Sequence, residues 1–478
     1  MEKITAVMVY NLIFTCNAMD GRQVSNLSYI SHHSGEDIRE MLKAIGVDDV
    51  LDLYRDIPEK YILKTPPDIG DPLTEQEVYE KIVSMLSKNT PRLKVFLGGG
   101  VWPHYIPAAV KQIVSRSEFL TSYTPYQPEA SQGMLTALFE FQSLAADLYG
   151  VDVVNSSMYD WSTAVGEAFR MAMRYTGRNK IVYAGFCGPE RVRIAQTYVE
   201  PMEGRLVRTP MDGKGNVEME RLKDAVDGET AAVYVENPTY LGSIVGNVEE
   251  VGEVAHDAGA LYIVGCEPTS LGLLKPPGEY GADIVVGEGQ PLGLPVSFGG
   301  PLLGILGCNL DRRLLHNMPG RLVGMTETLK DGRRAFTMVL RAREQDIRRE
   351  KATSNICTNQ ALCAVAAAAY LSLLGKNGLR KLARHIFDKT AYFIERLSKV
   401  YGVEAPLVDA PHYMEFTYRV KGLEPRRLLK SLLDKGYVAG LVLGGRFPEI
   451  GEGILTCVTE VHSIEDIEGY ATVLEGLV

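Results

Sequence analysis

The sequence has few cysteines and histidines, and none of them lies in a pattern typical of a metal site. Its seven cysteines are scattered without a Cys-x-x-Cys pair, and its eight histidines show no His-Glu-x-x-His spacing. Zinc and iron sites need closely spaced sulfur and nitrogen ligands, so neither metal is expected. Scattered cysteines in odd number are typical of a reduced protein, which predicts a cytoplasmic location.

The chain also lacks a surplus of positive charge. Its 50 Lys and Arg residues are outnumbered by 60 Asp and Glu residues, which gives a net charge of −10. Nucleic acids and anionic membranes attract basic surfaces, so neither partner is expected. One basic run stands apart and fits either a docking patch for an acidic partner or an ordinary solvated helix face. It comprises Arg341, Arg343, Arg348, Arg349 and Lys351.

No long hydrophobic run marks the N-terminal region as a membrane span. Residues 6–16 form a short apolar run behind Lys3 that is too short to cross a bilayer and has no small-x-small cleavage site. We therefore interpret residues 1–28 as an N-terminal extension, with Met19 as an alternative start. A mass measurement on the native protein would test this interpretation.

The remaining sequence alternates short strands with helices. It is 46% hydrophobic and long enough for two or three domains of roughly 100 to 200 residues each. Helical spacing near the start predicts a helical arm over residues 29–115. Residues 116–330 alternate β-branched runs with amphipathic helices, which predicts a large α/β domain with a mostly parallel sheet. Residues 331–478 predict a helical connection and a small α+β domain.

The predicted elements of the arm are helices over residues 36–45 and 74–86. The predicted strands of the large domain are 151–154, 180–184, 205–207, 231–235, 261–264, 283–286 and 302–306. Two long helices are expected over 359–374 and 379–400.

The densest polar segment is residues 123–133, Tyr-Thr-Pro-Tyr-Gln-Pro-Glu-Ala-Ser-Gln-Gly. Pro125 and Pro128 push the residues before them into extended geometry, which predicts a stiff loop. A helix follows, with Ser131 as its expected N-cap and Gly150 as its C-terminal stop. By composition alone the loop fits an ordinary proline-restrained connection whose tyrosines cover the core.

Several long polar segments together resemble the P-protein of the glycine cleavage system, glycine dehydrogenase (decarboxylating). They are YTPYQPEASQG with FEFQSLAADLYG behind it, FLGGGVWPHYIP from Phe96, PGRLVGMT from Pro319 and REQDIRREKATSNICTNQAL from Arg343. The resemblance runs from about Tyr29 to the C-terminus. The chain length matches subunit 1 of the split form, in which the P-protein is made as two chains. The family implies fold type I of pyridoxal-phosphate (PLP)-dependent transferases, which is aspartate aminotransferase-like and agrees with the predicted domain order.

The resemblance also points to an absence. Fold type I enzymes hold PLP on a lysine just after a strand of the large domain, but residues 283–301 contain no lysine and Gln290 aligns with its position. The aspartate that keeps the pyridine nitrogen protonated is replaced by Gly265. Glu267, two residues further on, does not reach the same point. Trp161 stands in the segment expected to hold the phosphate.

A non-autonomous enzyme subunit follows from this resemblance. PLP is expected to be bound covalently by subunit 2 of the P-protein, where glycine loses CO₂ and its aminomethyl group passes to the lipoyl group of the H-protein. An α2β2 heterotetramer is the expected assembly, and this chain would line the site from across the subunit junction. Arg343 fits either a carboxylate ligand or a structural ion pair. The expected contributors are Trp102, Tyr123, Tyr126, Gln127, Glu129 and Arg343.

Two other interpretations stay open at this point. One is a self-sufficient PLP enzyme that uses Lys351, the only lysine in a polar block. The other is a non-catalytic scaffold that docks the H-protein. Asn355, Cys357 and Thr358 precede the first long C-terminal helix and are expected to cap it rather than to react.

Overall fold

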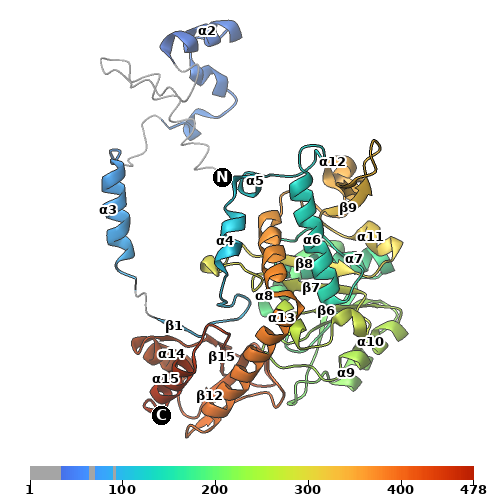
Figure 1. Ribbon diagram of the computed structural model, residues 1–478, viewed down its shortest axis with the longest axis vertical. Coiled ribbons are helices and arrows are strands. Elements are labelled where there is room, and N and C mark those ends of the chain that lie inside the picture. The colour runs from blue at the N-terminus through green and yellow to red at the C-terminus, as the bar shows by residue number, and fades with distance from the viewer. Residues whose placement is uncertain (1–33, 64–69, 90–92) are drawn as a thin grey trace. The chain divides into compact units, whose positions relative to one another are not determined.

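The computed structural model describes residues 34–63, 70–89 and 93–478 (Figure 1). The expectations for residues 1–28, including the alternative start at Met19, lie outside the described residues. The chain divides into two compact units, residues 1–90 and residues 91–478.

The first unit holds the two helices that spacing predicted. Ser34 caps the first of them with its hydroxyl, and Gly46 ends it in the left-handed conformation. Thr74 and Glu77 form a reciprocal capping box at the second. Its elements are α2 (Gly35–Ile45), η1 (Val50–Tyr54), η2 (Glu59–Tyr61) and α3 (Glu75–Leu86).

A seven-stranded sheet in the order β2-β8-β7-β6-β5-β3-β4 forms the centre of the second unit. Strands β3 to β7 are mutually parallel, whereas β8 is antiparallel to β7 and β2 is antiparallel to β8. The mostly parallel sheet is thereby confirmed. Its strands are β2 (Val153–Val154), β3 (Lys180–Ala184), β4 (Arg205–Thr209), β5 (Thr230–Glu236), β6 (Leu261–Gly265), β7 (Ile284–Glu288) and β8 (Gly304–Cys308).

Helices cover both faces of this sheet, because apolar side chains alternate along each strand. In β5, Val233 and Val235 pack with α6, α10 and α13, whereas Ala232 and Tyr234 pack with α7 and α8 on the other face (Figure 1). The helices of this layer are α4 (Ala108–Val114), α5 (Ser117–Leu120), α6 (Gln132–Tyr149), α7 (Trp161–Thr176), α8 (Pro189–Val199), α9 (Met219–Ala225), α10 (Val248–Asp257) and α11 (Arg312–Asn317).

The two long helices expected near the C-terminus form one element, α13 (Ala361–Ser398), which bends at Gly375 with φ of 57°. It packs against α4 and α6 and against the short turn η4 (Pro268–Gly272). Among the described helices α13 alone is long and apolar enough to cross a membrane, yet half of its most apolar stretch is buried inside the protein. These contacts are those of a core helix.

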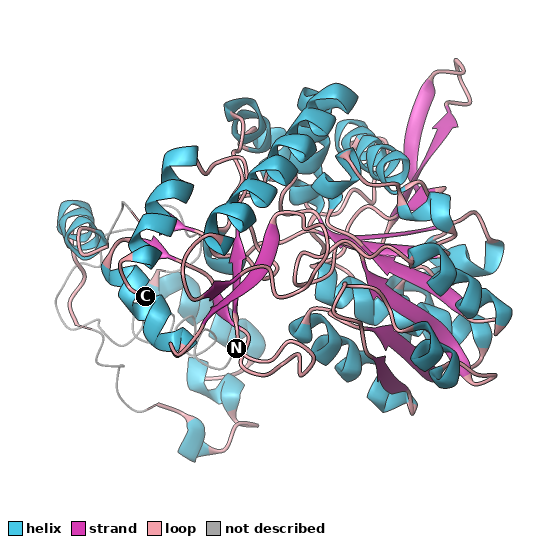
Figure 2. Cartoon of the chain, turned by 90° about the horizontal axis from the view of Figure 1, so that it is seen from below, coloured by secondary structure: helices cyan, strands magenta, loops and turns pink. Residues whose placement is uncertain are grey.

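The small domain is a four-stranded antiparallel sheet in the order β11-β12-β15-β14. An antiparallel hairpin of β9 and β10 precedes α13 and projects from the body (Figure 2). The elements of this region are β9 (Leu322–Glu327), β10 (Arg334–Val339), α12 (Gln345–Arg348), β11 (Val403–Glu404), β12 (Glu415–Val420), α14 (Pro425–Asp434), β13 (Tyr437–Val438), β14 (Leu441–Val442), β15 (Ile454–Cys457) and α15 (Ile464–Glu475).

The segment between the arm and the large domain is tied into the second unit. Strand β1 (Lys94–Val95) pairs with β13 of the small domain, and α4 packs on α13. Residues 93–115, assigned to the arm from sequence, therefore belong to the compact unit that follows it.

Candidate functional site

The carboxyl ends of the parallel strands β5, β6 and β7 meet at one edge of the sheet, where ligands bind in open α/β folds. Gln290 lies just beyond β7 and is fully buried. Its side-chain oxygen accepts the Trp102 N–H at 3.0 Å. Its amide nitrogen donates to the carbonyls of Trp102 at 3.1 Å and Leu294 at 2.9 Å. The residue at the expected lysine position is thus a structural amide that joins two loops.

The end of β6 leaves no room for an aspartate. A Cβ atom on Gly265 would lie 2.5 Å from the Tyr234 hydroxyl and 2.9 Å from Cζ2 of Trp161, and real Cβ atoms do not approach other atoms so closely. Trp161 begins α7, and its buried indole fills this space. The tryptophan that sequence analysis noted as a misfit is therefore what occupies the niche.

A buried ion pair packs against Trp161 in the same niche. The guanidinium carbon of Arg191 lies 3.5 Å from the centroid of the Trp161 ring. Its Nη1 donates to Glu236 Oε2 at 2.5 Å, and the Tyr234 hydroxyl donates to Glu236 Oε1 at 3.0 Å. Burial raises the pKa of Glu236, and the charge of Arg191 opposes that rise. This pair was not predicted from the sequence, although a carboxylate that ends an apolar parallel strand is a signal for the ligand edge.

Further buried carboxylates surround the niche. Glu288 ends β7 and accepts backbone N–H groups of Trp161, Gln290 and Leu303 at 3.2, 3.0 and 2.9 Å. Burial raises its pKa to about 7. Glu415 accepts the Gly99 N–H at 2.6 Å, and burial raises its pKa to about 7 as well.

Glu267 is also buried, but its side chain is committed to a local turn. It accepts the backbone N–H groups of Thr269 and Ser270, both at 2.9 Å, and so caps η4. It therefore does not replace the missing aspartate, as expected from its position in the sequence.

These residues do not fit PLP. The cavity among Trp102, Trp161, Arg191 and Glu415 has room for a volume of about 10 Å³, which is the space of one water at most. Among the described residues, the niche holds no lysine for an imine, and its carboxylates are already bonded, Glu236 to Arg191, and Glu267 and Glu415 to backbone N–H groups. Lys351 is exposed in the turn η8 (Arg349–Lys351) and does not line this cavity. The interpretation as a self-sufficient PLP enzyme therefore has no lysine to rely on.

The proline-rich loop lies on the surface. Tyr123 is 68% exposed, and its hydroxyl shares a hydrogen bond of 2.7 Å with Thr358. The interpretation that the loop tyrosines cover the core is therefore wrong. The capping expectation for Thr358 is wrong too, because its hydroxyl pairs with Tyr123 while Gln360 begins α13 without a side-chain cap.

Local capping of α6 also differs from expectation. Ser131 occupies the N-cap position, but its side chain makes no capping hydrogen bond. The neighbouring Gln132 joins the loop to the hairpin instead, donating to the carbonyls of Pro128 at 2.7 Å and Phe336 at 2.8 Å. Gly150 ends α6 in the left-handed conformation, as predicted.

Tyr126 sits between two arginines. Its hydroxyl accepts a hydrogen bond of 2.6 Å from Nη2 of Arg321, and the guanidinium carbons of Arg321 and Arg341 lie 5.2 and 4.9 Å from the ring centroid. Arg321 was missed as a site residue, although it stands inside the PGRLVGMT segment. Gln127 and Glu129 are exposed, and neither side chain has a hydrogen bond or ion pair within the described part of the chain.

Arg343 has a structural role. Its guanidinium is buried and donates to the carbonyls of Leu340 and Gly320, both at 3.1 Å, and to that of Met318. Burial lowers its pKa. Three of its five N–H donors are bonded to main-chain carbonyls of this chain, and within the described residues it forms no ion pair. Trp102 is buried, and its backbone is bonded to the side chain of Gln290.

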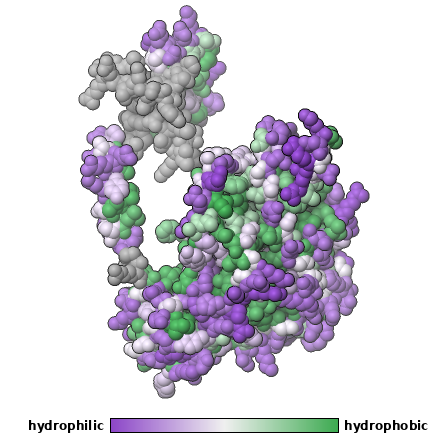
Figure 3. All heavy atoms as spheres, in the orientation of Figure 1, coloured by the Kyte–Doolittle hydropathy of each residue, from purple (hydrophilic) through white to green (hydrophobic). Residues whose placement is uncertain are grey.

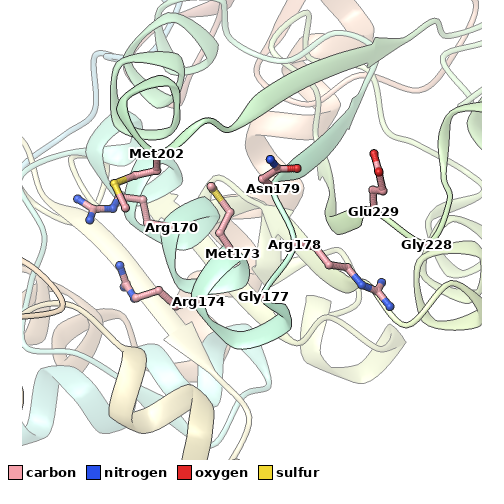
Figure 4. Close-up of a pocket in the computed structure, with 9 residues that line it drawn as sticks. All are labelled: Arg170, Met173, Arg174, Gly177, Arg178, Asn179, Met202, Gly228 and Glu229. Carbon is pink, nitrogen blue, oxygen red and sulfur yellow. The ribbon is translucent and has the colours of Figure 1, made fainter.

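A separate cleft of about 510 Å³ lies at the other end of the sheet (Figure 4). Asn179 and Glu229 line it just before β3 and β5 begin, so it is remote from the ligand edge. Arg174 and Arg178 point in different directions, and Arg178 donates to the carbonyls of Thr230 and Ala258 at 2.9 and 2.8 Å. These bonds hold helix and strand ends together.

The sequence of this chain is similar to those of known proteins over most of its length. The family model of the glycine cleavage system P-protein matches residues 27–474. A relative from Staphylothermus marinus, "Probable glycine dehydrogenase (decarboxylating) subunit 1", is 46% identical, and the match covers 91% of this chain and 95% of the relative. A relative of the same name from Aeropyrum pernix is 48% identical, with coverage of 92% and 96%.

Solved structures with a similar fold include a P-protein of the same family. A crystal structure of glycine decarboxylase (P-protein) of the glycine cleavage system in inhibitor-bound form has a TM-score of 0.84 and 39% identity, covering 94% of this chain and 100% of that chain. A cysteine desulfurase from Thermococcus onnurineus has a TM-score of 0.57 at 16% identity, covering 86% and 99%, which shows the fold alone. The neighbours confirm the predicted fold type I of PLP-dependent transferases.

Proposed function

Because this chain belongs to the P-protein family of the glycine cleavage system, we propose that it is the half of a two-chain glycine decarboxylase that carries no PLP of its own. The chain is a subunit of glycine dehydrogenase (decarboxylating). In our proposal subunit 2 binds PLP covalently, and the two chains assemble as an α2β2 heterotetramer. Together they decarboxylate glycine and transfer its aminomethyl group to the lipoyl group of the H-protein.

The filled niche is the observation that carries this proposal. Trp161, the Arg191 and Glu236 pair, and the Gln290 amide take up the volume and the anchor positions that a cofactor would need. A chain that keeps the enzyme fold but fills the cofactor niche with its own side chains needs a partner that holds the cofactor. Bound to subunit 2, PLP would supply the electron sink for the loss of CO₂ from glycine.

The surface loop suits a role across the subunit junction. Gln127 and Glu129 have no partners within the described residues, and Tyr123 and Tyr126 are 68% and 37% exposed. We propose that these four side chains line the partner's site, position glycine and exclude water. Trp102 and Arg343 are left out of that role, because both are buried and bonded within this chain.

A docking face for subunit 2 lies beside the loop. We define it by Tyr105, Leu120 and Leu373, large apolar side chains that are 66%, 59% and 54% exposed. Apolar residues gather over α4, α6 and α13 on the same side of the second unit (Figure 3). Exposed apolar patches on a soluble chain mark interaction surfaces.

A cytoplasmic location belongs to the same proposal. Six cysteines within the described residues are free thiols, and five of them are buried. Free buried thiols suit a reducing compartment.

Two measurements on purified proteins test the proposal. The chain mixed with PLP alone is expected to show no visible absorbance band of a lysine-bound cofactor, and such a band, lost in Lys351→Ala, would overturn the assignment. Added to subunit 2 and the H-protein, the chain is expected to switch on glycine-dependent exchange of labelled CO₂. Tight binding of the H-protein with no effect on exchange would instead support the scaffold interpretation.

A further inference from the structure

Arg321 lines a small pocket beside Tyr123, Thr124 and Pro125 of the loop. The pocket is lined by Tyr123, Arg321 and Asn359 among others. Arg321 is 4% exposed and precedes β9, and its backbone carbonyl accepts the Ser156 N–H at 2.8 Å. Its backbone is therefore anchored to the segment after β2, and its side chain is buried whereas Tyr126 is 37% exposed.

Arg321 is paired with Glu344 through charge but not through a hydrogen bond. Its Nε lies 3.6 Å from Glu344 Oε2, which is too long for a hydrogen bond, and both Arg321 Nε and Glu344 Oε1 are buried without a hydrogen-bond partner. Cys357 Sγ lies 3.9 Å from Nη2, a weak contact. The one strong bond of this guanidinium goes to the Tyr126 hydroxyl at 2.6 Å.

That bond leaves Tyr126 ready to donate. A phenol that accepts a hydrogen bond from a cation still has its own proton to give, and the cation polarises it. Tyr126 is 37% exposed, and its ring is flanked by Arg341 as well as Arg321. Asn359 adds a second donor, because its buried Nδ2 has no partner. Arg321 Nε and Asn359 Nδ2 both line the pocket, whose volume of about 10 Å³ holds one water at most, so an anion would meet Tyr126 at the surface rather than enter the pocket.

The geometry points to an anion-binding pair: the Tyr126 hydroxyl donates to a carboxylate or phosphate oxygen, and Arg321 supplies the charge behind it. The inference rests on the proposed function, because the anion arrives from across the junction with subunit 2. Two groups have this chemistry, the carboxylate of glycine and the phosphate of the partner's PLP. Arg321 acts through Tyr126 and is a positioning residue.

The test uses the complex with subunit 2 and the H-protein, carrying Arg321→Ala, Arg321→Lys or Tyr126→Phe. If glycine is the ligand, KM for glycine rises roughly 10- to 100-fold in Arg321→Ala and Tyr126→Phe while PLP retention is unchanged. If the phosphate is the ligand, PLP retention falls by a similar factor at unchanged KM. Arg321→Lys is expected to show a smaller defect than Arg321→Ala, because lysine keeps the positive charge but lacks the planar guanidinium.

Guanidinium ion added to Arg321→Ala separates a positioning role from a folding role. It replaces the missing positive charge and is expected to restore whichever of KM or PLP retention the substitution changed. The matched controls are Arg334→Lys, an exposed arginine 5.7 Å from the Phe336 ring, and Tyr401→Phe, which is 92% exposed. Both controls are expected to match wild type. Unchanged KM and PLP retention in Tyr126→Phe, or a defect in Arg321→Ala that guanidinium does not restore, overturns the inference. A wild-type complex without glycine turnover would refute the proposed function instead.

Discussion

At the carboxyl end of β7 an amide has taken the place of an amine, and its three hydrogen bonds explain what the amide contributes. Gln290 joins the loop after β7 to the backbone of Trp102, which is 188 residues away in the chain. An isolated amide cannot form an imine, and this one has no free donor nitrogen to offer. The position has become part of the packing between loops.

Restoring the lysine is therefore expected to destabilise the chain without restoring the cofactor. Gln290→Lys breaks the pairing with Trp102 and buries an ammonium near Glu288, whose oxygens already accept three backbone N–H groups, and this is expected to cost about 3 to 5 kcal/mol of unfolding free energy. Denaturant unfolding measures the loss, and absorbance with added PLP measures binding. Subunit 2 is the positive control for the spectrum. A stable Gln290→Lys chain that bound PLP would show that the niche is open.

The Arg191 and Glu236 pair is expected to stabilise the chain only as a pair. Arg191→Met leaves a buried carboxylate alone and is expected to cost about 3 to 5 kcal/mol, whereas adding Glu236→Gln recovers most of that loss. Arg193→Met, on the exposed side of α8, is the matched control and is expected to be near neutral. Denaturant unfolding of the single and double variants gives the coupling energy. Additive losses would contradict the expected coupling.

At the scale of whole elements, parallel strands bring buried carboxylates to one edge of the sheet. Strands β5 and β7 each end on a glutamate, and β12 of the small domain begins with one. Such an edge usually faces a ligand. Here backbone N–H groups and Arg191 satisfy the carboxylates, so the edge is internally paired.

These strand ends predict a pH dependence of stability. Burial raises the pKa of Glu288 from 4.5 to about 7, so the folded chain binds this proton more tightly than the unfolded chain. The contribution of this group to the unfolding free energy therefore falls by about 3 kcal/mol as pH rises from 4.5 to about 7. Above pH 7 the contribution stays constant. Glu415 contributes in the same direction.

Denaturant unfolding at pH 5 and pH 8 checks this for the wild type and Glu288→Gln. The variant is expected to show the smaller fall, because it has lost one titrating group. Burial lowers the pKa of His412 to about 4, which acts in the opposite direction but is shared by both proteins and cancels in the comparison. Equal pH dependence in the two proteins would refute the assignment to Glu288.

At the scale of the whole molecule, subunit 2 is proposed to cover the exposed apolar side chains near the loop. Leu120 ends α5, three residues before Tyr123, and is 59% exposed. Leu120→Lys is expected to weaken association with subunit 2 by roughly 10-fold or more, because it buries a charge in an apolar contact.

The isolated Leu120→Lys chain is expected to unfold at the wild-type temperature, since the side chain is solvated in the free chain. Leu310→Lys, a substitution at a site 72% exposed before α11, is the control. Calorimetric titration of subunit 2 measures affinity, and thermal unfolding of each free chain measures folding. Equal affinities of the two variants would place the docking face elsewhere.

The sequence by itself determined the order of strands and helices, the family, and the missing lysine at Gln290. Those features are carried by local periodicity, by turn residues and by residue identity, which need no knowledge of distant contacts. Two features of the elements were not predicted: α13 continues through Gly375, which bends the helix without ending it, and residues 322–339 form the β9–β10 hairpin where no strand was expected.

Only the tertiary structure decided what fills the niche and which arginine faces the loop. Trp161, Arg191 and Glu236 meet at Gly265 from separate helices and strands. Arg343 and Arg321 look alike in sequence, yet carbonyls from Met318 and Gly320 surround the first and Tyr126 binds the second. Burial and pairing depend on residues far apart in the chain, so no local pattern distinguishes a structural arginine from one that faces a ligand.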